Sequence, residues 1–449
     1  TAGSEIELLP EAIHFNTLIK TKIVEETMTD VQTTNQSICV VGWGMSGITA
    51  ALEAAEAGYD VVLIEKAPYL GGKVTQFYHY FPKLCPPNCG LEINFRRMKV
   101  NPKIRFFTMA EVVNISGQEG DYDVSVRLAP RYVNEKCTCC GKCAEVCETE
   151  IENPFNFGMD KVKAAYLPQE FAFPMRYVLD PSIVGTDEGK KCSDACEYNA
   201  IDLEMQETNF DLKVGSIIWA AGWEPYDASK IEYYGFGEYK NVITNVMMER
   251  LAAPNGPTGG KIVRPSDGKE AKNVAFVQCA GSRDENHLPY CSGICCLASM
   301  KHATYLREQY PDSDATIFFI DIRAIDRLED FYIKVQEDEK IKFIKSKIAN
   351  ISEDEKTGDL LLEGENTKTG EKIAMTFDMV VLATGMVPNK IDIDPSPDVS
   401  YDEYGFFICD PDKAGIYGAG CVRRPTDVAS SVQDATATAL KAIQSIVRR

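Results

Sequence analysis

The sequence has no excess of basic charge, no long apolar run and very little histidine. Lys and Arg number 47 against 67 for Asp and Glu, so the formal net charge is −20 at pH 7. A nucleic-acid-binding protein needs a basic face, so this balance argues against that class. No apolar run approaches the ~20 residues of a membrane-spanning helix, and the N-terminal region carries no secretory signal. We therefore expect a cytoplasmic protein with no membrane span of its own, which reaches a membrane through partner proteins.

Cysteine, in contrast, is abundant: the chain of 449 residues holds 16 of them, and many are clustered. Clustered thiols in a long chain without an export signal indicate metal or redox chemistry rather than a disulfide framework. The four histidines are scattered, so a zinc site built on imidazole is not expected. With 45% hydrophobic residues, the chain can bury the cores of roughly two to four domains.

A βαβ unit begins at Ser37. The apolar run 38–41 is typical of a buried strand, the Ala-rich segment 48–58 has helical spacing, and a second strand is expected at 61–64. This is the local structure that a dinucleotide-binding motif requires.

The first turn of this unit reads G-x-G-x-x-G, with Gly42, Gly44 and Gly47. The first glycine allows a tight turn, the second lets the backbone approach a pyrophosphate, and the third lets helix and strand pack closely. Glu65 ends the second strand, where a carboxylate can accept hydrogen bonds from the ribose hydroxyls. The unit therefore predicts a bound dinucleotide.

Later segments resemble flavoproteins of the glutathione-reductase type. Gly71 and Gly72, followed by Lys73, are similar to the second flavin motif of that family and favour FAD over NAD. The segment 105–112 is expected to be a strand whose end lies beside the adenine in that family.

Two segments, 214–225 and 377–388, repeat one pattern: an apolar strand, a turn of two small residues and Gly, and a Pro. This pattern resembles the A-T-G motif of flavoproteins with two dinucleotide folds. The segment 415–421 and a helix over 426–440 resemble the last flavin motif, although Ala419 and Gly420 stand where that motif has Asp. The resemblance implies the following cofactor-binding residues: Gly42, Gly44, Ser46, Gly47, Glu65, Lys66, Gly71, Gly72, Lys73, Glu111, Val112, Ala221, Gly222, Thr384, Gly385, Gly420, Ser431 and Val432.

An iron–sulfur motif, C-x₂-C-x₂-C-x₃-C, is formed by Cys137, Cys140, Cys143 and Cys147. In bacterial ferredoxins this run supplies three ligands to one [4Fe–4S] cluster, and its last cysteine binds the other cluster. The segment 191–201 resembles the second half of a ferredoxin.

That second half is incomplete, because it contains only Cys192 and Cys196. Crossed ligation then completes one set, Cys137, Cys140, Cys143 and Cys196, and leaves only Cys147 and Cys192 for the other. We expect one [4Fe–4S] cluster in this insert. Two alternatives stay open: Cys139 could serve an altered second site, and the run could bind zinc instead.

A second βαβ unit is expected from a strand at 273–279, a helix at 298–309 and a strand at 316–321. Its first turn lacks the glycines that cradle a phosphate and carries Cys291, Cys295 and Cys296 instead. The position where NADH would bind has therefore become a thiol site.

Another thiol pair, Cys85 and Cys89, follows the flavin glycines. We expect a second [4Fe–4S] cluster near the flavin, held by Cys85, Cys89, Cys291 and Cys295, with Cys296 as an alternative ligand. A redox-active dithiol and a set of inert thiols remain as alternatives. Four cysteines in or beside apolar strands are expected to be small buried hydrophobic residues: Cys39, Cys279, Cys409 and Cys421.

Taken together, these motifs resemble one family. The G-x-G-x-x-G turn, Leu-Gly-Gly-Lys, Cys-Pro-Pro-Asn-Cys-Gly, the insert and the cysteine-containing turn are similar to the flavin-containing A subunits of CoB–CoM heterodisulfide reductases. The resemblance extends from residue 38 to the C-terminus. Within the family, the run 81–94 is most similar to the A subunit of the quinone-interacting membrane-bound oxidoreductase.

This resemblance implies an FAD and iron–sulfur electron-transfer subunit, peripheral on the inner face of the membrane and attached through sister subunits. It implies electron exchange between a menaquinol-linked membrane partner and a sulfur enzyme such as adenylylsulfate reductase, with no residue acting as a general base. One alternative is the A-like subunit of a sulfur-oxidising or methanogenic heterodisulfide reductase. Another is an NAD(P)H-dependent flavin disulfide oxidoreductase, against which the missing second fingerprint argues.

The predicted fold class is α/β: a two-dinucleotide-binding-domain flavoprotein of the thioredoxin- and glutathione-reductase type with an inserted ferredoxin-like segment. The expected parts are an extension (1–36), the flavin domain (37–130), the insert (131–205), the flavin-domain return and linker (206–260), a second Rossmann-like domain (261–370) and the flavin-domain closure (371–449).

Overall fold

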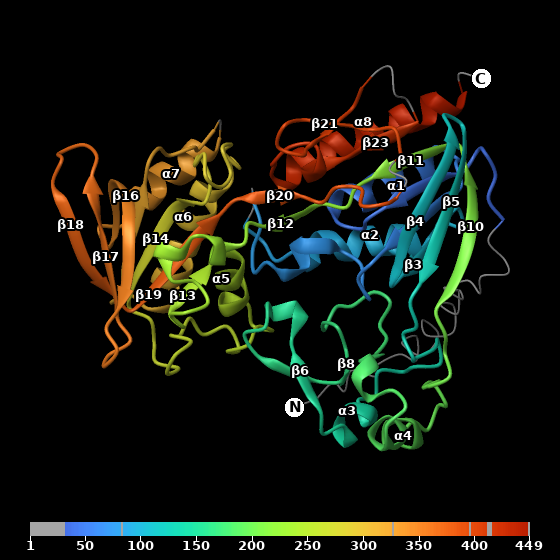
Figure 1. Cartoon of the computed structure of the whole chain (residues 1–449), viewed down its shortest axis with the longest axis horizontal. Coiled ribbons are helices and arrows are strands. Elements are labelled where there is room, and N and C mark those ends of the chain that lie inside the picture. The colour runs from blue at the N-terminus through green and yellow to red at the C-terminus, as the bar shows by residue number, and fades with distance from the viewer. Residues whose placement is uncertain (1–31, 82–83, 326, 395–396, 411–414, 448–449) are drawn as a thin grey trace, which may run out of the picture.

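The chain forms two α/β folds side by side, with a smaller segment packed below their junction (Figure 1). The computed structural model describes residues 32–81, 84–325, 327–394, 397–410 and 415–447. Most of the predicted extension, 1–31, lies outside the described residues. The three parts are called here the flavin fold, the second fold and the insert.

The flavin fold is built on a parallel sheet of five strands in the order β23-β11-β1-β2-β3. Its strands are β1 (Ile38–Val41), β2 (Val61–Glu65), β3 (Ile104–Thr108), β11 (Ser216–Trp219) and β23 (Ile416–Gly418). The apolar runs that predicted β1 and β2 are buried throughout, as expected for central strands covered on both faces. The strand expected at 105–112 is interrupted at Met109, where the backbone turns with φ of 57°.

Helices and a small antiparallel sheet cover the two faces of this sheet. The helices are α1 (Met45–Glu56), α2 (Asn88–Val100) and α8 (Val428–Val447). The antiparallel strands, in the order β10-β5-β4, are β4 (Ala110–Gln118), β5 (Asp121–Leu128) and β10 (Thr208–Val214). Short strands β21 (Ser400–Tyr401) and β22 (Phe407–Ile408) pair near the chain end. The last helix is longer than the expected 426–440.

The second fold contains a sheet of seven strands in the order β13-β19-β14-β15-β16-β17-β18. Its strands are β13 (Val242–Thr244), β14 (Asn273–Ala280), β15 (Asp314–Phe319), β16 (Ile341–Glu353), β17 (Leu360–Asn366), β18 (Lys372–Phe377) and β19 (Met379–Thr384). Its helices are α5 (Asn245–Ala252), α6 (Cys295–Gln309) and α7 (Leu328–Gln336).

The boundaries of the second fold differ from the expected 261–370. Strand β13 and helix α5 begin before residue 261, and β19 lies after residue 370. The reason is that β19, the apolar strand of the second repeated motif, pairs in parallel with both β13 and β14 at the centre of the sheet.

Two crossings of the chain join the folds. β12 (Trp223–Pro225) leads into the second fold, β20 (Met386–Pro388) leads out of it, and the two pair antiparallel (Figure 1). Each crossing follows one copy of the repeated strand–Gly–Pro pattern, so the repeat marks the passage between the folds.

The insert leaves the flavin fold after β5 and returns at β10. It contains α3 (Lys142–Val146), α4 (Asp187–Asp194), β6 (Glu150–Glu152), β7 (Lys161–Lys163), β8 (Ala165–Tyr166) and β9 (Val178–Leu179). Arg131 ties the root of the insert to the flavin fold, since Nη2 donates to Pro68 O (2.5 Å) and to Thr108 Oγ1 (2.8 Å). Phe173 also packs in the flavin-fold core.

Candidate cofactor sites

The glycine turn after β1 has the shape of a phosphate cradle. Gly42 adopts φ of +91°, and a Cβ there would lie 2.6 Å from Ala220 O, so β11 itself requires this glycine. A Cβ on Gly47 would lie 2.0 Å from Gly42 O. A Cβ on Gly44, in contrast, would meet only Gly72 Cα, at 4.0 Å. Protein packing therefore explains Gly42 and Gly47, whereas a ligand passing over the start of α1 explains Gly44.

Glu65 closes one side of this cradle. Its Oε2 accepts a hydrogen bond from Trp43 N and its Oε1 from Ala67 N, both at 2.7 Å. Burial raises the pKa of Glu65, although the backbone N–H groups oppose that rise. The carboxylate is held rigidly beside the turn, and its remaining lone pairs can accept ribose hydroxyls.

Two other predicted cofactor residues, Lys66 and Glu111, form an ion pair of 2.6 Å between Nζ and Oε1. Glu111 also pairs with Arg127 at 2.5 Å. Hydrogen bonding to Lys66 is the main cause of the lowered pKa of Glu111. These side chains therefore lie on the adenine-side rim, with Val112 following in β4.

The last flavin motif lies against the glycine turn. A Cβ on Gly420 would meet Ser46 Oγ at 2.1 Å and Ser431 Oγ at 3.6 Å, so this turn, the start of α1 and the start of α8 converge. Gly420 N–H donates to Asp434 Oδ2 at 2.7 Å. Sequence reasoning found no acid in the motif; the structure supplies one from the next turn of α8, which also contains Val432.

The two repeated turns lie in different environments. Ala221 lies against Gly42, within the flavin fold, and Asn389 Nδ2 donates to its carbonyl at 2.8 Å. Thr384, in contrast, lies in the second fold, where its carbonyl accepts a hydrogen bond from Cys295 Sγ (3.6 Å). A Cβ on Gly385 would meet Ser282 Oγ at 2.3 Å. The structure therefore places Thr384 and Gly385 beside second-fold thiols rather than at the glycine cradle, while Gly222 follows Ala221.

Gly71 and Gly72 both adopt positive φ and turn the chain across Gly44. A Cβ on Gly72 would lie 2.6 Å from Gly44 Cα, so two stretches of bare backbone cross there. Lys73 then points to the linker, where Nζ pairs with Glu224 Oε2 at 2.5 Å.

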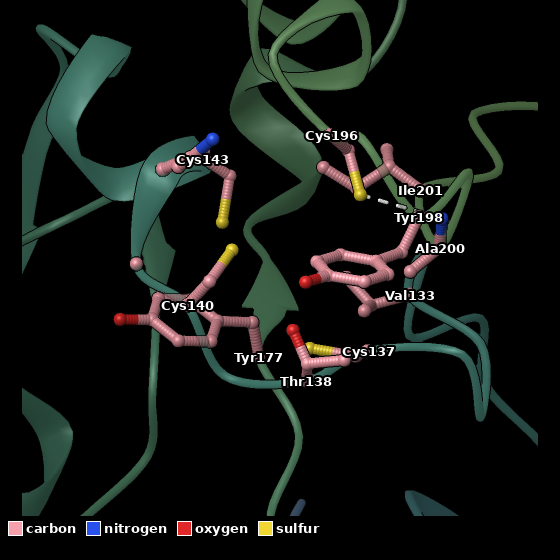
Figure 2. Close-up of a pocket in the computed structure, with 12 residues that line it drawn as sticks. Val133, Cys137, Thr138, Cys140, Cys143, Tyr177, Cys196, Tyr198, Ala200 and Ile201 are labelled. Carbon is pink, nitrogen blue, oxygen red and sulfur yellow. Dashed lines mark hydrogen bonds between the residues drawn. The ribbon is translucent and has the colours of Figure 1, made fainter.

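Four cysteines of the insert surround one cavity (Figure 2). They are the set expected from crossed ligation: Cys137, Cys140, Cys143 and Cys196. The other lining groups are mostly apolar or aromatic, among them Val133, Tyr177, Tyr198, Ala200 and Ile201. Ala200 N–H donates to Cys196 Sγ at 3.3 Å, a contact typical of the hydrogen bonds that tune cluster sulfur.

The thiol chemistry of this cavity fits a polymetallic centre. Burial raises the pKa of Cys143 to about 11, so this thiol stays protonated at neutral pH until a metal displaces the proton. Within the described residues, no three His, Cys, Asp or Glu side chains converge on a single-ion site. Thiols spread around a cavity suit a [4Fe–4S] cluster, which spaces its ligands, better than a zinc ion.

The remnant of the second ferredoxin site is a closed core. Cys147 and Cys192 are both buried among apolar side chains of the insert. Cys147 Sγ donates to Glu188 Oε1 at 3.3 Å, and Cys192 Sγ to Cys143 O at 3.5 Å. After burial, the groups that raise the pKa of Cys139 belong to the first set, beginning with Cys137. Cys139 therefore lies beside the first cavity rather than in this core.

Four cysteines also gather in the second fold, and one of them was not expected. Burial and then the thiols of Cys279, Cys296 and Cys291 raise the pKa of Cys295 far above its usual value. The pKa of Cys279 rises to about 11 through burial, with Cys296 and Cys291 as its nearest thiol neighbours. The prediction that Cys279 is merely a hydrophobic core residue is therefore wrong.

A β-bulge causes this placement. The register of β14 against β19 shifts between Val277 and Ala280, and Cys279 adopts φ of 57°. A bulge redirects a side chain, and here it turns Cys279 toward the N-terminal end of α6, where Cys295 and Cys296 begin the helix. A cysteine at the end of a strand, just before Ala-Gly, was the available signal.

The pair Cys85 and Cys89 lies around Tyr80. Burial and then these two thiols raise the pKa of Tyr80, and Tyr80 forms a bridge with Cys85. Cys89 is in the first turn of α2 and is exposed. The second fold thus offers four thiols without a contribution from this pair.

Comparisons with known proteins agree with this architecture. The FAD-dependent oxidoreductase family matches residues 37–83. Two solved thioredoxin reductases, from T. acidophilum and Lactococcus lactis, superpose with a TM-score of 0.51 each. They are 15% and 17% identical, and the alignments cover 91% and 92% of this chain and 97% and 100% of theirs. The predicted fold class is confirmed.

Curated relatives align over nearly the whole chain. The second iron–sulfur A subunit of the CoB–CoM heterodisulfide reductase of Methanopyrus kandleri is 38% identical over 441 residues, which are 95% of this chain and 67% of that protein. The A subunit of the H(2):CoB-CoM heterodisulfide,ferredoxin reductase of Methanothermobacter marburgensis is 34% identical, over 96% of this chain and 67% of its own. The chain therefore spans about two thirds of the length of these relatives.

Proposed function

Because this chain belongs to the family of heterodisulfide reductase A subunits, we propose that it is an FAD and iron–sulfur electron-transfer subunit of a multi-subunit oxidoreductase. FAD, when bound, supplies two-electron chemistry that iron–sulfur clusters divide into single-electron steps. The chain itself provides the cradle for the flavin, two thiol sites, and the packing that keeps these sites in register.

The observation that carries this proposal is the second fold. At the turn between β14 and α6, where a nicotinamide enzyme has phosphate-cradling glycines, this chain places Cys279, Cys291, Cys295 and Cys296. Helix N–H groups at the start of α6 can stabilise thiolates there. The second fold therefore exchanges electrons through thiol-bound metal, and the insert provides a second such site.

Two ligand sets are possible for the second-fold cluster. The set expected from sequence joins Cys85 and Cys89 to Cys291 and Cys295. The proximity of Cys279 favours Cys279, Cys291, Cys295 and Cys296, which lie within one fold and need no ligand from another. We propose the latter set, and it leaves Cys85 and Cys89 as a separate thiol pair.

The finer assignment is to a quinone-interacting membrane-bound complex that exchanges electrons with adenylylsulfate reductase or a similar sulfur enzyme. It rests on the similarity of the run 81–94 to the A subunit of that complex. In the part of the chain that the structure describes, no helix is long and apolar enough to cross a membrane. In this proposal, sister subunits provide the attachment to the membrane.

Purification of the native complex tests this assignment. Affinity purification of the tagged chain from its own membranes, followed by mass spectrometry, should recover quinone-reactive sister subunits. Recovery of CoB–CoM-type heterodisulfide reductase subunits instead would favour the alternative named by the relatives. Recovery of the chain alone, with flavin that NADH reduces, would contradict both.

A further inference from the structure

Two consecutive residues of α5, Glu249 and Arg250, meet all three parts of the chain at one buried point. Helix α5 lies on the side of the second fold that faces the insert and the flavin fold (Figure 1). The flavin fold reaches this point through η3 (Gly72–Gln76), a single helical turn that begins at the flavin glycines. The insert reaches it through its tip, the loop 153–160 between β6 and β7.

Arg250 is fully buried and bonds to each part. Its Nε donates to Asn156 Oδ1 in the insert tip (2.8 Å), and its Nη1 donates to Gln76 O in the flavin fold (3.3 Å). Its Nη2 donates to both oxygens of Asn255 in the second fold, at 2.9 Å each. The guanidinium carbon lies 4.5 Å from the ring centre of Phe155. Burial lowers the pKa of Arg250 to about 10, so the side chain is still cationic at neutral pH.

The two partners of Arg250 are also bonded to each other. Gln76 Nε2 donates to Phe155 O at 3.0 Å, so the flavin fold and the insert tip meet directly beneath the guanidinium. An Arg fork with fixed donors suits such a junction, because Lys presents a single mobile ammonium.

Glu249 holds the next stretch of the flavin fold. Its Oε2 accepts a hydrogen bond from Tyr78 N at 3.0 Å. Its Oε1 lies 2.6 Å from both Lys301 Nζ and His302 Nε2 of α6. Lys301 Nζ also donates to His79 O at 2.6 Å. The segment 76–79 is therefore gripped from both sides by buried polar groups of the second fold.

Such a grip is needed because the chain crosses between the two folds only in the short strands β12 and β20. Folds joined by short linkers change their relative orientation unless an interface holds them. Electron transfer between fixed sites slows steeply with distance, so a mobile second fold would not keep its thiols at a constant distance from the flavin segment.

We propose that Glu249 and Arg250 form a clamp that holds the second fold in one orientation against both the flavin fold and the insert, with Arg250 as a positioning residue. The clamp links the segment that follows the flavin glycines to the insert tip and to α5. This proposal rests on the proposed electron-transfer function for its consequence, but the clamp itself depends only on protein contacts.

The test compares three variants of the full, anaerobically reconstituted chain. Arg250→Lys removes the fork, and Asn156→Ala removes only its acceptor in the insert tip. Arg264→Lys is the matched control, because Arg264 is also a buried arginine but bonds within the second fold, to Asp359 Oδ1 (2.8 Å) and Thr357 O (2.6 Å).

Two quantities are measured: hydrogen–deuterium exchange of the peptide 153–160, and the rate at which photoreduced flavin equilibrates with the second-fold cluster. Both clamp variants should exchange faster at the tip and should lose the single fast equilibration phase of the wild type. The Arg264→Lys control should match the wild type in both measurements.

Each contrary outcome is distinct. Unchanged tip exchange in both clamp variants would show that no clamp exists. Faster exchange with an unchanged equilibration rate would show a purely structural contact and overturn the positioning role. Absence of flavin–cluster equilibration in the wild type would overturn the proposed function and the positioning role together, while tip exchange would still decide whether the clamp exists.

Discussion

Gly44 lacks a side chain for no reason internal to the protein. A Cβ there would meet only Gly72 Cα, at 4.0 Å, so Gly44→Val should fold with unchanged thermal stability. The valine side chain would occupy the path of the pyrophosphate, so the purified variant should contain little flavin. Flavin content and melting temperature check this, with the exposed Ala57→Val at the other end of α1 as control. Full flavin content in folded Gly44→Val would contradict the FAD site.

Cys279 and Cys85 distinguish the two ligand sets of the second-fold cluster. Cys279→Ser should lower the iron content by one cluster, about four atoms per chain. Cys85→Ser should leave the iron unchanged, because Cys85 lies beside Tyr80 rather than among the second-fold thiols. Anaerobic iron analysis of both variants decides between the sets, and the reverse pattern would restore the ligands expected from sequence.

At the residue scale, the sequence predicted motifs better than it predicted neighbours. Its spacing was sufficient for the insert, since the structure gathers Cys137, Cys140, Cys143 and Cys196 around one cavity. It was insufficient for Cys279, because an apolar strand gives no sign of the bulge that redirects one side chain. Asp434 was missed for a related reason: it lies one helical stretch beyond the motif that it serves.

At the scale of elements, the insert combines one open thiol cavity with one closed core. Cys196→Ser should remove the insert cluster, since it supplies one of four ligands. Cys192→Ser should keep it, because Cys192 is buried in the core with Cys147 and lines no part of the cavity. The electron paramagnetic resonance spectrum of the reduced protein measures this. Loss of the same signal in both variants would contradict the separation of the two sites.

Helices α5 and α6 share a buried charge cluster that makes stability depend on pH. Burial tends to raise the pKa of Glu249, but Lys301 and His302 outweigh it and lower the pKa to about 2. A carboxyl whose folded pKa is lowered stabilises the protein above its usual pKa of 4.5, and this contribution is lost as the pH falls toward 2. Glu249→Gln should be destabilised at pH 7 by about 3–5 kcal/mol, because it leaves two buried cationic partners uncompensated.

The pH series provides the check for this cluster. Thermal unfolding of wild type and Glu249→Gln should differ most at neutral pH, and the difference should narrow as the pH falls from 4.5 toward 2. A constant difference across this range would show that the charge of Glu249 contributes nothing to stability.

Elements of the flavin fold were predictable because their strands are apolar runs and their turns carry glycine. The limits of the second fold were not, because β13 is only three residues long and β19 enters the sheet from far along the chain. Local patterns identify a buried strand but not the sheet in which it pairs. The repeated strand–Gly–Pro pattern correctly marked both crossings.

At the scale of the whole molecule, three sites are arranged around one junction. The glycine cradle opens on η3, the insert tip meets η3 at Gln76, and the second fold reaches the same point through Arg250. An enzyme that used a nicotinamide cofactor would need a phosphate cradle in its second fold. This chain has thiols there, so the account predicts an electron route through metal rather than through hydride.

An anaerobic reductive titration of the reconstituted chain tests this central claim most directly. Flavin absorbance and the paramagnetic signals of the clusters are followed during addition of NADH, NADPH and then dithionite. The account predicts that NADH and NADPH leave the flavin oxidised, that dithionite bleaches it and produces two cluster signals, and that Cys279→Ser loses one of these signals. Stoichiometric bleaching of the flavin by NADH, unchanged in Cys279→Ser, would contradict it.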